Sequence, residues 1–81
     1  MIHVRLMERP ECGLCDEAMA ALRRLSRRTP LDIERVNVAR DPALLDLYVV
    51  RVPVLVVGDA ELDVAGVDDA AIDRWLDEVA R

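Results

Sequence analysis

The sequence feature that most constrains this chain is a Cys-Gly-Leu-Cys motif at residues 12–15, which contains both of its cysteines. The motif lies between a short apolar run, Ile2 to Met7, and a helical pattern that begins near Leu14. A Cys-x-x-Cys motif at a strand-to-helix junction is typical of a dithiol redox site. The first cysteine lies ahead of a helix N-terminus, where free backbone N–H groups and the helix dipole stabilise a thiolate. The second cysteine is close enough along the chain to form a disulfide with the first.

Two other interpretations of the cysteines remain open from the residues alone. In one they are half of a metal site, and in the other they are buried, inert side chains. The metal interpretation is weak, because His3 is the only histidine and a complete zinc site would need ligands from a second copy of the chain. We therefore expect no resident metal.

Composition bounds the size and class of the protein. With 81 residues, of which 53% are hydrophobic, the chain is expected to form a single domain over residues 1–81. No apolar run approaches the about 20 residues of a membrane span, and the N-terminus lacks the form of a secretory signal peptide. We therefore expect a cytoplasmic protein without membrane contact, in a reducing setting where cysteines are more often catalytic than structural.

Charge and aromatic content argue against nucleic acid as a partner. The formal net charge is −5, and the chain has no basic stripe that would displace counterions from a phosphate backbone. The only aromatic residues are Tyr48 and Trp75, so bases have no platform on which to stack. We expect a monomer.

Periodicity predicts two strands in the first half of the chain. Residues Ile2 to Met7 alternate, which predicts one apolar face and places Met7 with the more polar side chains. Residues Leu31 to Val38 predict a second strand. Its apolar residues change parity midway, so we expect a twist or bulge near Glu34 and Arg35.

A further strand and its return are predicted in the second half. The run from Val52 to Val57 is the most apolar in the chain and indicates a buried strand. Pro53 must open that strand, because proline cannot donate to an internal ladder. Gly58 and Asp59 fit a hairpin turn, after which residues Ala60 to Val64 return as an antiparallel strand.

The first predicted helix follows the cysteine motif. Its apolar residues share one face, and its last turn is basic, with Arg27 and Arg28 at its end. Pro30 stops it.

Two more helices are predicted from capping signals. Asp41 is a suitable N-cap and Pro42 a suitable first residue for a short helix that ends at about Tyr48. Asp68 caps a final helix. The apolar face of this last helix contains Ile72, Trp75, Leu76 and Val79. The element order is therefore βαβαββα, an α/β arrangement in which the crossovers demand parallel pairing and the hairpin an antiparallel edge.

Three segments of the chain resemble, in matching order, the glutaredoxin branch of the thioredoxin fold, especially small glutaredoxin-like proteins with Cys-x-x-Cys-Asp. Residues 9–15 resemble the redox motif and its entry loop. Arg51-Val52-Pro53 stands in the place of Thr-Val-Pro, whose proline is cis and faces the disulfide. Residues 65–69 stand in the place of the Gly-Gly-Cys-Asp-Asp loop, which holds the γ-glutamyl end of glutathione. The resemblance covers nearly the whole chain.

The fold implied by this resemblance is thioredoxin-like. It is a four-stranded mixed sheet with strand order 2-1-3-4, in which the first and last helices share one face and the middle helix lies on the other.

The resemblance also implies a dithiol–disulfide oxidoreductase that reduces protein or mixed disulfides, with Cys12, Cys15 and Pro53 as catalytic residues. In this hypothesis Cys12 is the nucleophile that forms a mixed disulfide with the substrate, and Cys15 resolves it. Pro53 turns the chain so that the Val52 backbone pairs with an extended substrate. Acidic side chains flank the motif and oppose the helix dipole, so we expect the pKa of Cys12 to be lowered only moderately from about 8.5. These side chains are Glu8, Glu11, Asp16 and Glu17, against Arg9 alone nearby.

Glutathione binding is implied more weakly, because Gly13, Leu14, Arg51 and Ala65 depart from the family pattern. The implied contacts are Arg9, Arg51, Val52, Gly66, Val67, Asp68 and Asp69. We expect no bound cofactor, with glutathione as a co-substrate that binds weakly, and either glutathione or a thioredoxin-type reductase as the electron donor. Two alternatives remain: an iron–sulfur cluster held between two subunits, which Gly13 would suit, and a non-catalytic interaction module.

Overall fold

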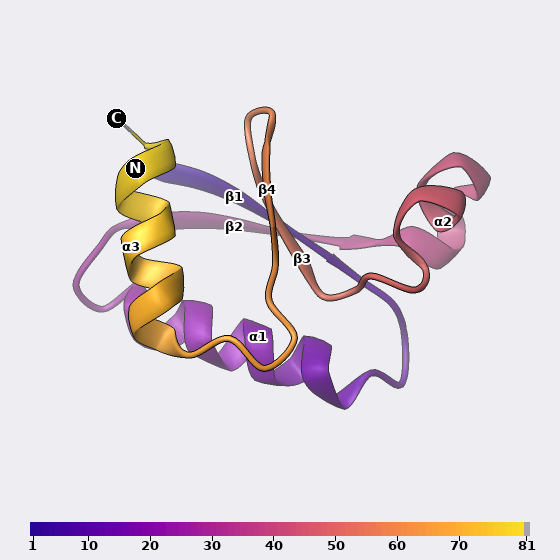
Figure 1. Cartoon of the computed structure of the whole chain (residues 1–81), viewed down its shortest axis with the longest axis horizontal. Coiled ribbons are helices and arrows are strands. Elements are labelled where there is room, and N and C mark those ends of the chain that lie inside the picture. Colours follow the sequence, from indigo (N-terminus) through magenta and orange to yellow (C-terminus); the bar gives the residue numbers. More distant parts are fainter. Residues whose placement is uncertain (81) are drawn as a thin grey trace.

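A four-stranded mixed sheet forms the middle of the molecule, with helices on both of its faces (Figure 1). The computed structural model describes residues 1–80. In chain order the elements are β1 (Ile2–Glu8), α1 (Gly13–Leu25), β2 (Leu31–Asn37), a 3₁₀ turn (Val38–Arg40), α2 (Pro42–Tyr48), β3 (Val54–Val57), β4 (Ala60–Asp63) and α3 (Asp69–Val79). The α/β class and the element order expected from the sequence are confirmed.

Strand β1 connects the two halves of the sheet. It pairs in parallel with β2 along its full length and antiparallel with β3. Strands β3 and β4 form a hairpin through Gly58, whose φ of 58° lies in the left-handed region that glycine tolerates. The resulting strand order, β2-β1-β3-β4, is the predicted one.

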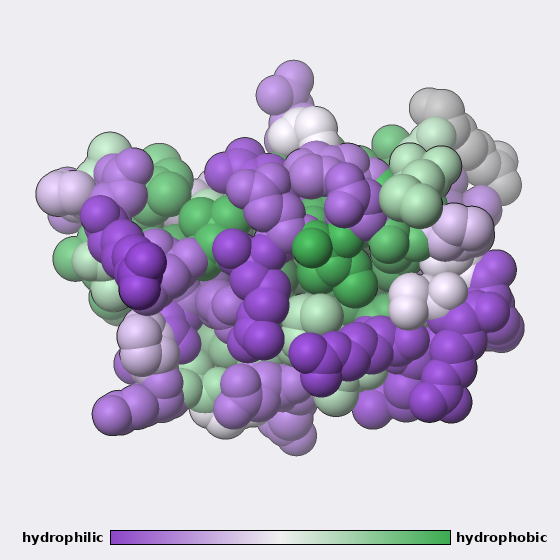
Figure 2. Space-filling view, turned by 180° about the vertical axis from the view of Figure 1, so that it is seen from behind, coloured by the Kyte–Doolittle hydropathy of each residue, from purple (hydrophilic) through white to green (hydrophobic). Residues whose placement is uncertain are grey.

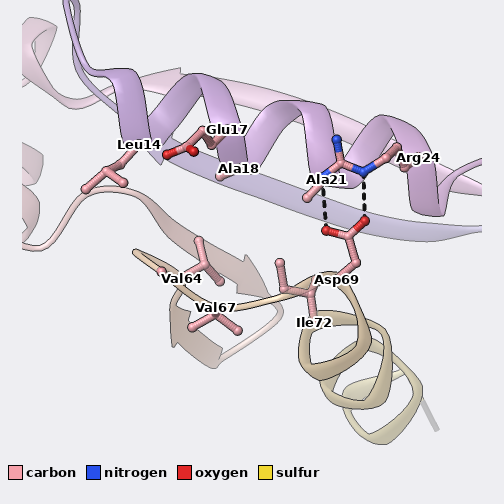
Figure 3. Close-up of a pocket in the computed structure, with 10 residues that line it drawn as sticks. Leu14, Glu17, Ala18, Ala21, Arg24, Val64, Val67, Asp69 and Ile72 are labelled. Atoms are coloured by element: carbon pink, nitrogen blue, oxygen red, sulfur yellow. Dashed lines mark hydrogen bonds and ion pairs between the residues drawn. The ribbon is translucent and has the colours of Figure 1, made fainter.

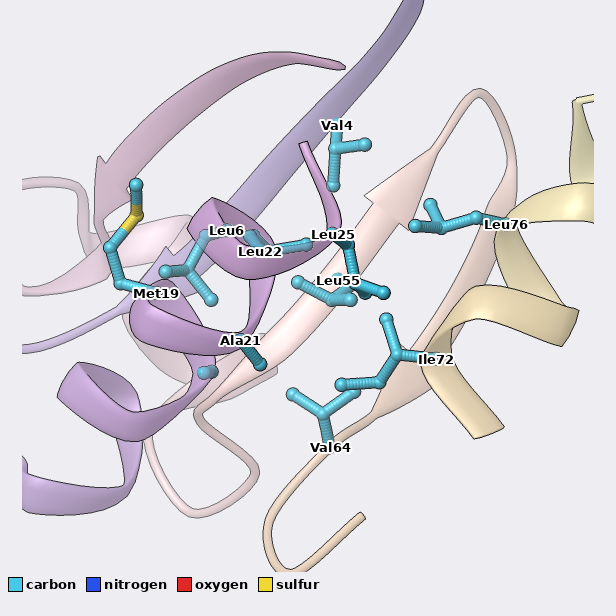
Figure 4. Packing of buried hydrophobic residues seen from close by; sticks show 11 residues of the cluster. Val4, Leu6, Met19, Ala21, Leu22, Leu25, Leu55, Val64, Ile72 and Leu76 are labelled. Carbon is cyan, nitrogen blue, oxygen red and sulfur yellow. The ribbon is translucent and has the colours of Figure 1, made fainter. Parts of the chain in front are cut away.

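Two apolar clusters hold the helices on the sheet. The larger cluster packs α1 and α3 against one face, where Leu6, Leu22 and Leu55 are fully buried (Figure 4). The smaller cluster packs α2 against the other face, where Met7 and Val54 are buried. The first and last helices therefore share a face, as predicted. None of the helices within residues 1–80 has the length and hydropathy that crossing a membrane requires.

Two expectations about the strands are wrong, and both have the same cause: helices cover both faces of the sheet, so apolar residues of either parity are buried. Met7 is only 1% exposed, so it does not belong to a polar face. Pairing of β1 with β2 is continuous, so β2 contains no bulge near Glu34 and Arg35. The apolar residues of β2 change parity because the first part of the strand packs under α1 and α3 on one face, and the second part packs under α2 on the other face. Ile33 packs in the larger cluster on one face, whereas Val36 packs in the smaller cluster on the other.

Helix α1 is shorter than its sequence suggests, because it ends at Leu25. The Ser26 hydroxyl donates to the Arg23 carbonyl at 2.7 Å, which offers that carbonyl a side-chain partner. The N–H groups of Arg27 and Arg28 donate to carbonyls three residues earlier, which tightens the chain into a turn. The expected basic last turn therefore extends past the helix.

The final helix begins as predicted. Asp68 is its N-cap, and its carboxylate accepts the N–H of Ala71 at 2.9 Å. Ile72 and Leu76 are buried, and Trp75 packs partly buried against the larger cluster. The predicted role of Trp75 in the core is confirmed.

The chain enters β3 through a cis peptide bond between Val52 and Pro53, as the resemblance implies. Strand β3 begins at Val54, just after the proline rather than at it. In the antiparallel register Met7 lies opposite Val54. Pro53 therefore lies at the same end of the sheet as the C-terminal end of β1, from which the chain continues to Cys12.

A polar cluster, here called the Arg51 clamp, consists of Tyr48, Arg51, Glu61 and Asp63 and holds the segment before Pro53. The Tyr48 hydroxyl donates to Glu61 at 2.5 Å. The Arg51 guanidinium donates to Glu61 and Asp63 at 2.8 Å each and lies 5.2 Å from the centre of the Tyr48 ring. The clamp therefore ties the end of α2 and the segment after it to strand β4.

The clamp changes the acidity of its members. The hydrogen bond to Glu61 and burial raise the pKa of Tyr48. Hydrogen bonds from Tyr48 and Arg51 lower the pKa of Glu61 from its ordinary value of 4.5. The stabilisation from ionised Glu61 is therefore present above that ordinary value, and it is lost as the pH falls through the lowered pKa.

We predict that Tyr48→Phe lowers the free energy of unfolding by about 1 kcal/mol at neutral pH, because it removes a hydrogen bond to a partly exposed carboxylate. Urea unfolding at neutral pH, and at a pH where Glu61 is protonated, measures this loss in both states. The loss should shrink at the acidic pH and in a Glu61→Gln background. An equal loss under all three conditions would contradict the proposed role of the clamp.

Candidate redox site

The two cysteines form a disulfide at the start of α1. Their Cα atoms are 5.2 Å apart, within the range of about 4.4–6.8 Å that is usual for a disulfide. Cys12 is partly exposed, whereas Cys15 is 1% exposed. Cys15 is inaccessible because it lies on the buried face of α1 with Met19 and Leu22. Cys12 is therefore the cysteine that an incoming group can reach.

The loop before the motif places Cys12 at the N-terminus of α1. Glu11 has a φ of 57°, a left-handed conformation that is uncommon for a residue with a side chain. Cys12 itself is extended and is the N-cap of α1. Its Sγ accepts the backbone N–H of Cys15 at 3.1 Å, and its carbonyl accepts the N–H of Asp16 at 3.1 Å. The sulfur thus lies where a helix N-terminus stabilises negative charge.

The surroundings of Cys12 are less acidic than the local sequence indicates, because a distant arginine pairs with one of the acidic residues. Arg35 donates two hydrogen bonds to Glu8, at 2.7 and 2.9 Å, and the Glu8 side chain is only 13% exposed. These contacts raise the pKa of Arg35. No local pattern pointed to Arg35, because the parallel pairing of β1 with β2 brings it to the site. The acidic residues near the motif that have no ion pair within residues 1–80 are Glu11, Asp16 and Glu17.

Arg9, the predicted cation for a glutathione carboxylate, is exposed. It has no ion-pair partner within the part of the chain that the structure describes, and it helps to line a polar hollow of about 180 Å³ beside the motif. Arg51, the other predicted cation, is held by both carboxylates of the clamp. Of these two arginines, Arg9 is the one whose guanidinium can receive a ligand without breaking an ion pair among the described residues.

Backbone N–H groups just before Pro53 are already hydrogen-bonded within the chain. The N–H of Val52 donates to the carbonyl of Tyr48 at 3.0 Å, and the N–H of Arg51 donates to the same carbonyl at 2.8 Å. We expected Val52 to pair with an extended substrate. Only its carbonyl is free for that purpose, among the described residues, unless the bond to Tyr48 opens.

The loop that resembles the glutathione cradle lies between β4 and α3. Gly66 has a φ of 75°, which favours glycine. Val67 donates its N–H to the carbonyl of Val64 at 3.1 Å. Asp69 accepts two hydrogen bonds from Arg24 of α1, at 2.7 and 3.0 Å (Figure 3). These contacts lower the pKa of Asp69.

Some of the predicted residues are brought together, and the side chains of two others are already paired. Cys12, Cys15 and Pro53 belong to segments that meet at one edge of the sheet. The side chains of Arg51 and Asp69 are occupied by partners within the chain. Within residues 1–80, no three histidine, cysteine or acidic side chains gather in a way that would hold a metal ion.

Comparison with known proteins agrees with the fold. The family described as glutaredoxin-like domain (DUF836) matches residues 3–77. A structural-genomics target protein from X. campestris, known from an X-ray structure, is 36% identical, with a TM-score of 0.80 and coverage of 93% of this chain and 96% of that one. No curated protein matches the chain.

Two more distant structures share the fold. A mutant thioredoxin from Halobacterium salinarum has 22% identity and a TM-score of 0.69, over 99% of this chain and 75% of that one. The glutaredoxin-like protein NrdH-redoxin from Escherichia coli has 22% identity and a TM-score of 0.63, over 90% of this chain and 93% of that one. Given its four-stranded 2-1-3-4 sheet, its cysteine pair and the match over residues 3–77, this chain belongs to the glutaredoxin-like family of the thioredoxin fold.

Proposed function

We propose that this protein is a dithiol–disulfide oxidoreductase that reduces disulfides of protein substrates. The observation that carries the proposal is the arrangement of the two sulfurs. Cys12 is partly exposed and accepts an N–H at the start of α1, while Cys15 is buried at disulfide distance behind it. One thiol is therefore suited to attack a substrate and the other to resolve the product.

The reaction proceeds by two thiol–disulfide exchanges. The Cys12 thiolate attacks one sulfur of the substrate disulfide, a mixed disulfide forms, and the other substrate sulfur leaves as a thiolate that takes up a proton. Cys15 then loses its proton and attacks the Cys12 sulfur. The Cys12–Cys15 bond forms and the second substrate thiol leaves. Two electrons pass from the dithiol to the substrate, and an external dithiol or reductase must return them.

A protein reductase suits the site better than glutathione as the electron donor. The side chains of Arg51 and Asp69 already have partners, and the N–H of Val52 already has an acceptor. Glutathione would have to compete with these bonds or use Arg9 alone as its cation. The structure of the Escherichia coli relative is described as the basis for a thioredoxin-like activity profile in a glutaredoxin-like protein, which fits the same proposal.

We predict that Cys12→Ser abolishes reduction of a protein disulfide such as that of insulin, because the remaining thiol, Cys15, is buried. Cys15→Ser should instead accumulate a covalent adduct on Cys12, because the mixed disulfide is not resolved. Turnover assays and intact-mass analysis distinguish the two variants. The assigned roles would be contradicted if the Cys12→Ser variant formed an adduct on Cys15 as fast as the Cys15→Ser variant forms one on Cys12.

The electron donor is tested by supplying each regenerating system in turn. We predict faster turnover with NADPH and a thioredoxin-type reductase than with glutathione and its reductase. Glutathione should bind with a dissociation constant on the order of 1 mM or weaker, and chemical-shift changes should map to Cys12, Val52, Gly66 and Asp68. Faster turnover with glutathione would contradict this assignment. A purified protein that absorbs visible light would instead favour a bound iron–sulfur cluster.

A further inference from the structure

Arg35 of β2 and Glu8, the last residue of β1, form an ion pair close to the redox site. Two hydrogen bonds, of 2.7 and 2.9 Å, join the guanidinium to the carboxylate. Hydrophilic side chains cover much of the surface seen from behind (Figure 2), but the Glu8 side chain is only 13% exposed. The carboxylates that pair with Arg24 and Arg51 are at least 36% exposed. Water therefore screens the charge of Glu8 less than it screens the charges of those carboxylates.

The strand register places this pair beside the start of α1. Leu6 and Ile33 pack in the larger cluster, under α1 and α3. Glu8 and Arg35 each follow two residues later on the same strands, so their side chains leave the same face of the sheet. The polar hollow of about 180 Å³ beside them is also lined by the loop that leads into the cysteine motif and by Asp16 of the first helical turn. The pair is therefore part of the electrostatic surroundings of the Cys12 sulfur.

The balance of charge around Cys12 depends on Arg35. The charged side chains of the motif, its entry loop and the adjoining strand ends are Glu8, Arg9, Glu11, Asp16, Glu17 and Arg35. Arg51, just before Pro53, is already neutralised in the clamp. The Glu8 hydrogen bonds raise the pKa of Arg35, and the charge of Asp16 adds to that effect. Because nearby anions destabilise a thiolate, loss of Arg35 would leave the site strongly unfavourable to an ionised Cys12.

We propose that Arg35 is a positioning residue of the redox site, which favours the Cys12 thiolate by neutralising Glu8 and offsetting Asp16. The inference rests on the proposed function and concerns its nucleophile, because the rate of attack on a disulfide depends on the thiolate fraction. Arg35 acts through Glu8 and needs no contact with the substrate. The guanidinium fixes this charge by two hydrogen bonds to one carboxylate, a geometry that lysine cannot provide.

Removing one partner at a time separates this role from simple fastening of the strand ends. The measurement is alkylation of the reduced protein against pH, with Cys12 modification followed by mass spectrometry. Arg35→Gln leaves Glu8 unpaired and should raise the Cys12 midpoint by about half a pH unit, which lowers the rate at neutral pH about threefold. Glu8→Gln leaves Arg35 unbalanced and should lower the midpoint by a similar amount. The double variant should lie near the wild-type midpoint.

Arg24→Gln is the matched control. Arg24 also donates two hydrogen bonds to one carboxylate, but it lies about three turns after Cys12 along α1, farther than the about 8 Å over which salt screens charges. This variant should keep the wild-type midpoint. Arg35→Lys keeps the charge, should restore most of the shift seen in Arg35→Gln, and serves with Glu8→Gln if Arg35→Gln does not fold.

A pair that only fastens the strands would shift the midpoint in the same direction when either partner is removed. Shifts of the same sign in Arg35→Gln and Glu8→Gln, no shift in either, or an equal shift in Arg24→Gln would overturn the inference. Alkylation requires no turnover, so the two proposals fail separately. If the midpoints move as expected but no protein disulfide is reduced, the proposed catalytic function fails and the role of Arg35 stands. If disulfides are reduced while the midpoints stay fixed, the role of Arg35 fails and the catalytic function stands.

Discussion

The N-terminus of α1 is the feature on which the rest of the redox site depends. Cys12 is its N-cap, and its sulfur accepts the N–H of Cys15. Strand β1 brings the chain to this point and is fixed from every side, because β2 and β3 bind its edges and the two apolar clusters cover its faces. The Cys12 sulfur therefore lies, partly exposed, shortly after the most constrained strand of the sheet.

Arginines from distant segments hold the parts of the site in place. Arg35 binds Glu8 at the end of β1, Arg24 binds Asp69 at the start of α3, and Arg51 binds the carboxylates of β4. The planar guanidinium can donate two parallel hydrogen bonds to one carboxylate, which lysine cannot do. Exposed pairs of this kind contribute little to stability one by one. They also engage Arg51 and Asp69, two of the residues that the family resemblance implies as glutathione contacts.

The elements and the exposure of the cysteines could be predicted from the sequence, because both depend on local patterns. Capping residues such as Asp68 marked the helix starts, and a cysteine before a helix is more exposed than one on its apolar face. Partners far apart along the chain were not predictable. Arg24 and Asp69 are 45 residues apart, and no local signal links them. The change of parity in β2 was misread as a bulge, because only the packing of α2 shows that both faces of the sheet are covered.

Alkylation of the reduced protein against pH tests the central claim most directly, with each modified cysteine identified by mass spectrometry. The helix N-terminus should make Cys12 react first, with a midpoint below the about 8.5 of a free thiol. Glu11, Asp16 and Glu17 should keep that midpoint above those of strongly oxidising sites. Preferential reaction at Cys15, or a Cys12 midpoint at or above the value of a free thiol, would contradict the account.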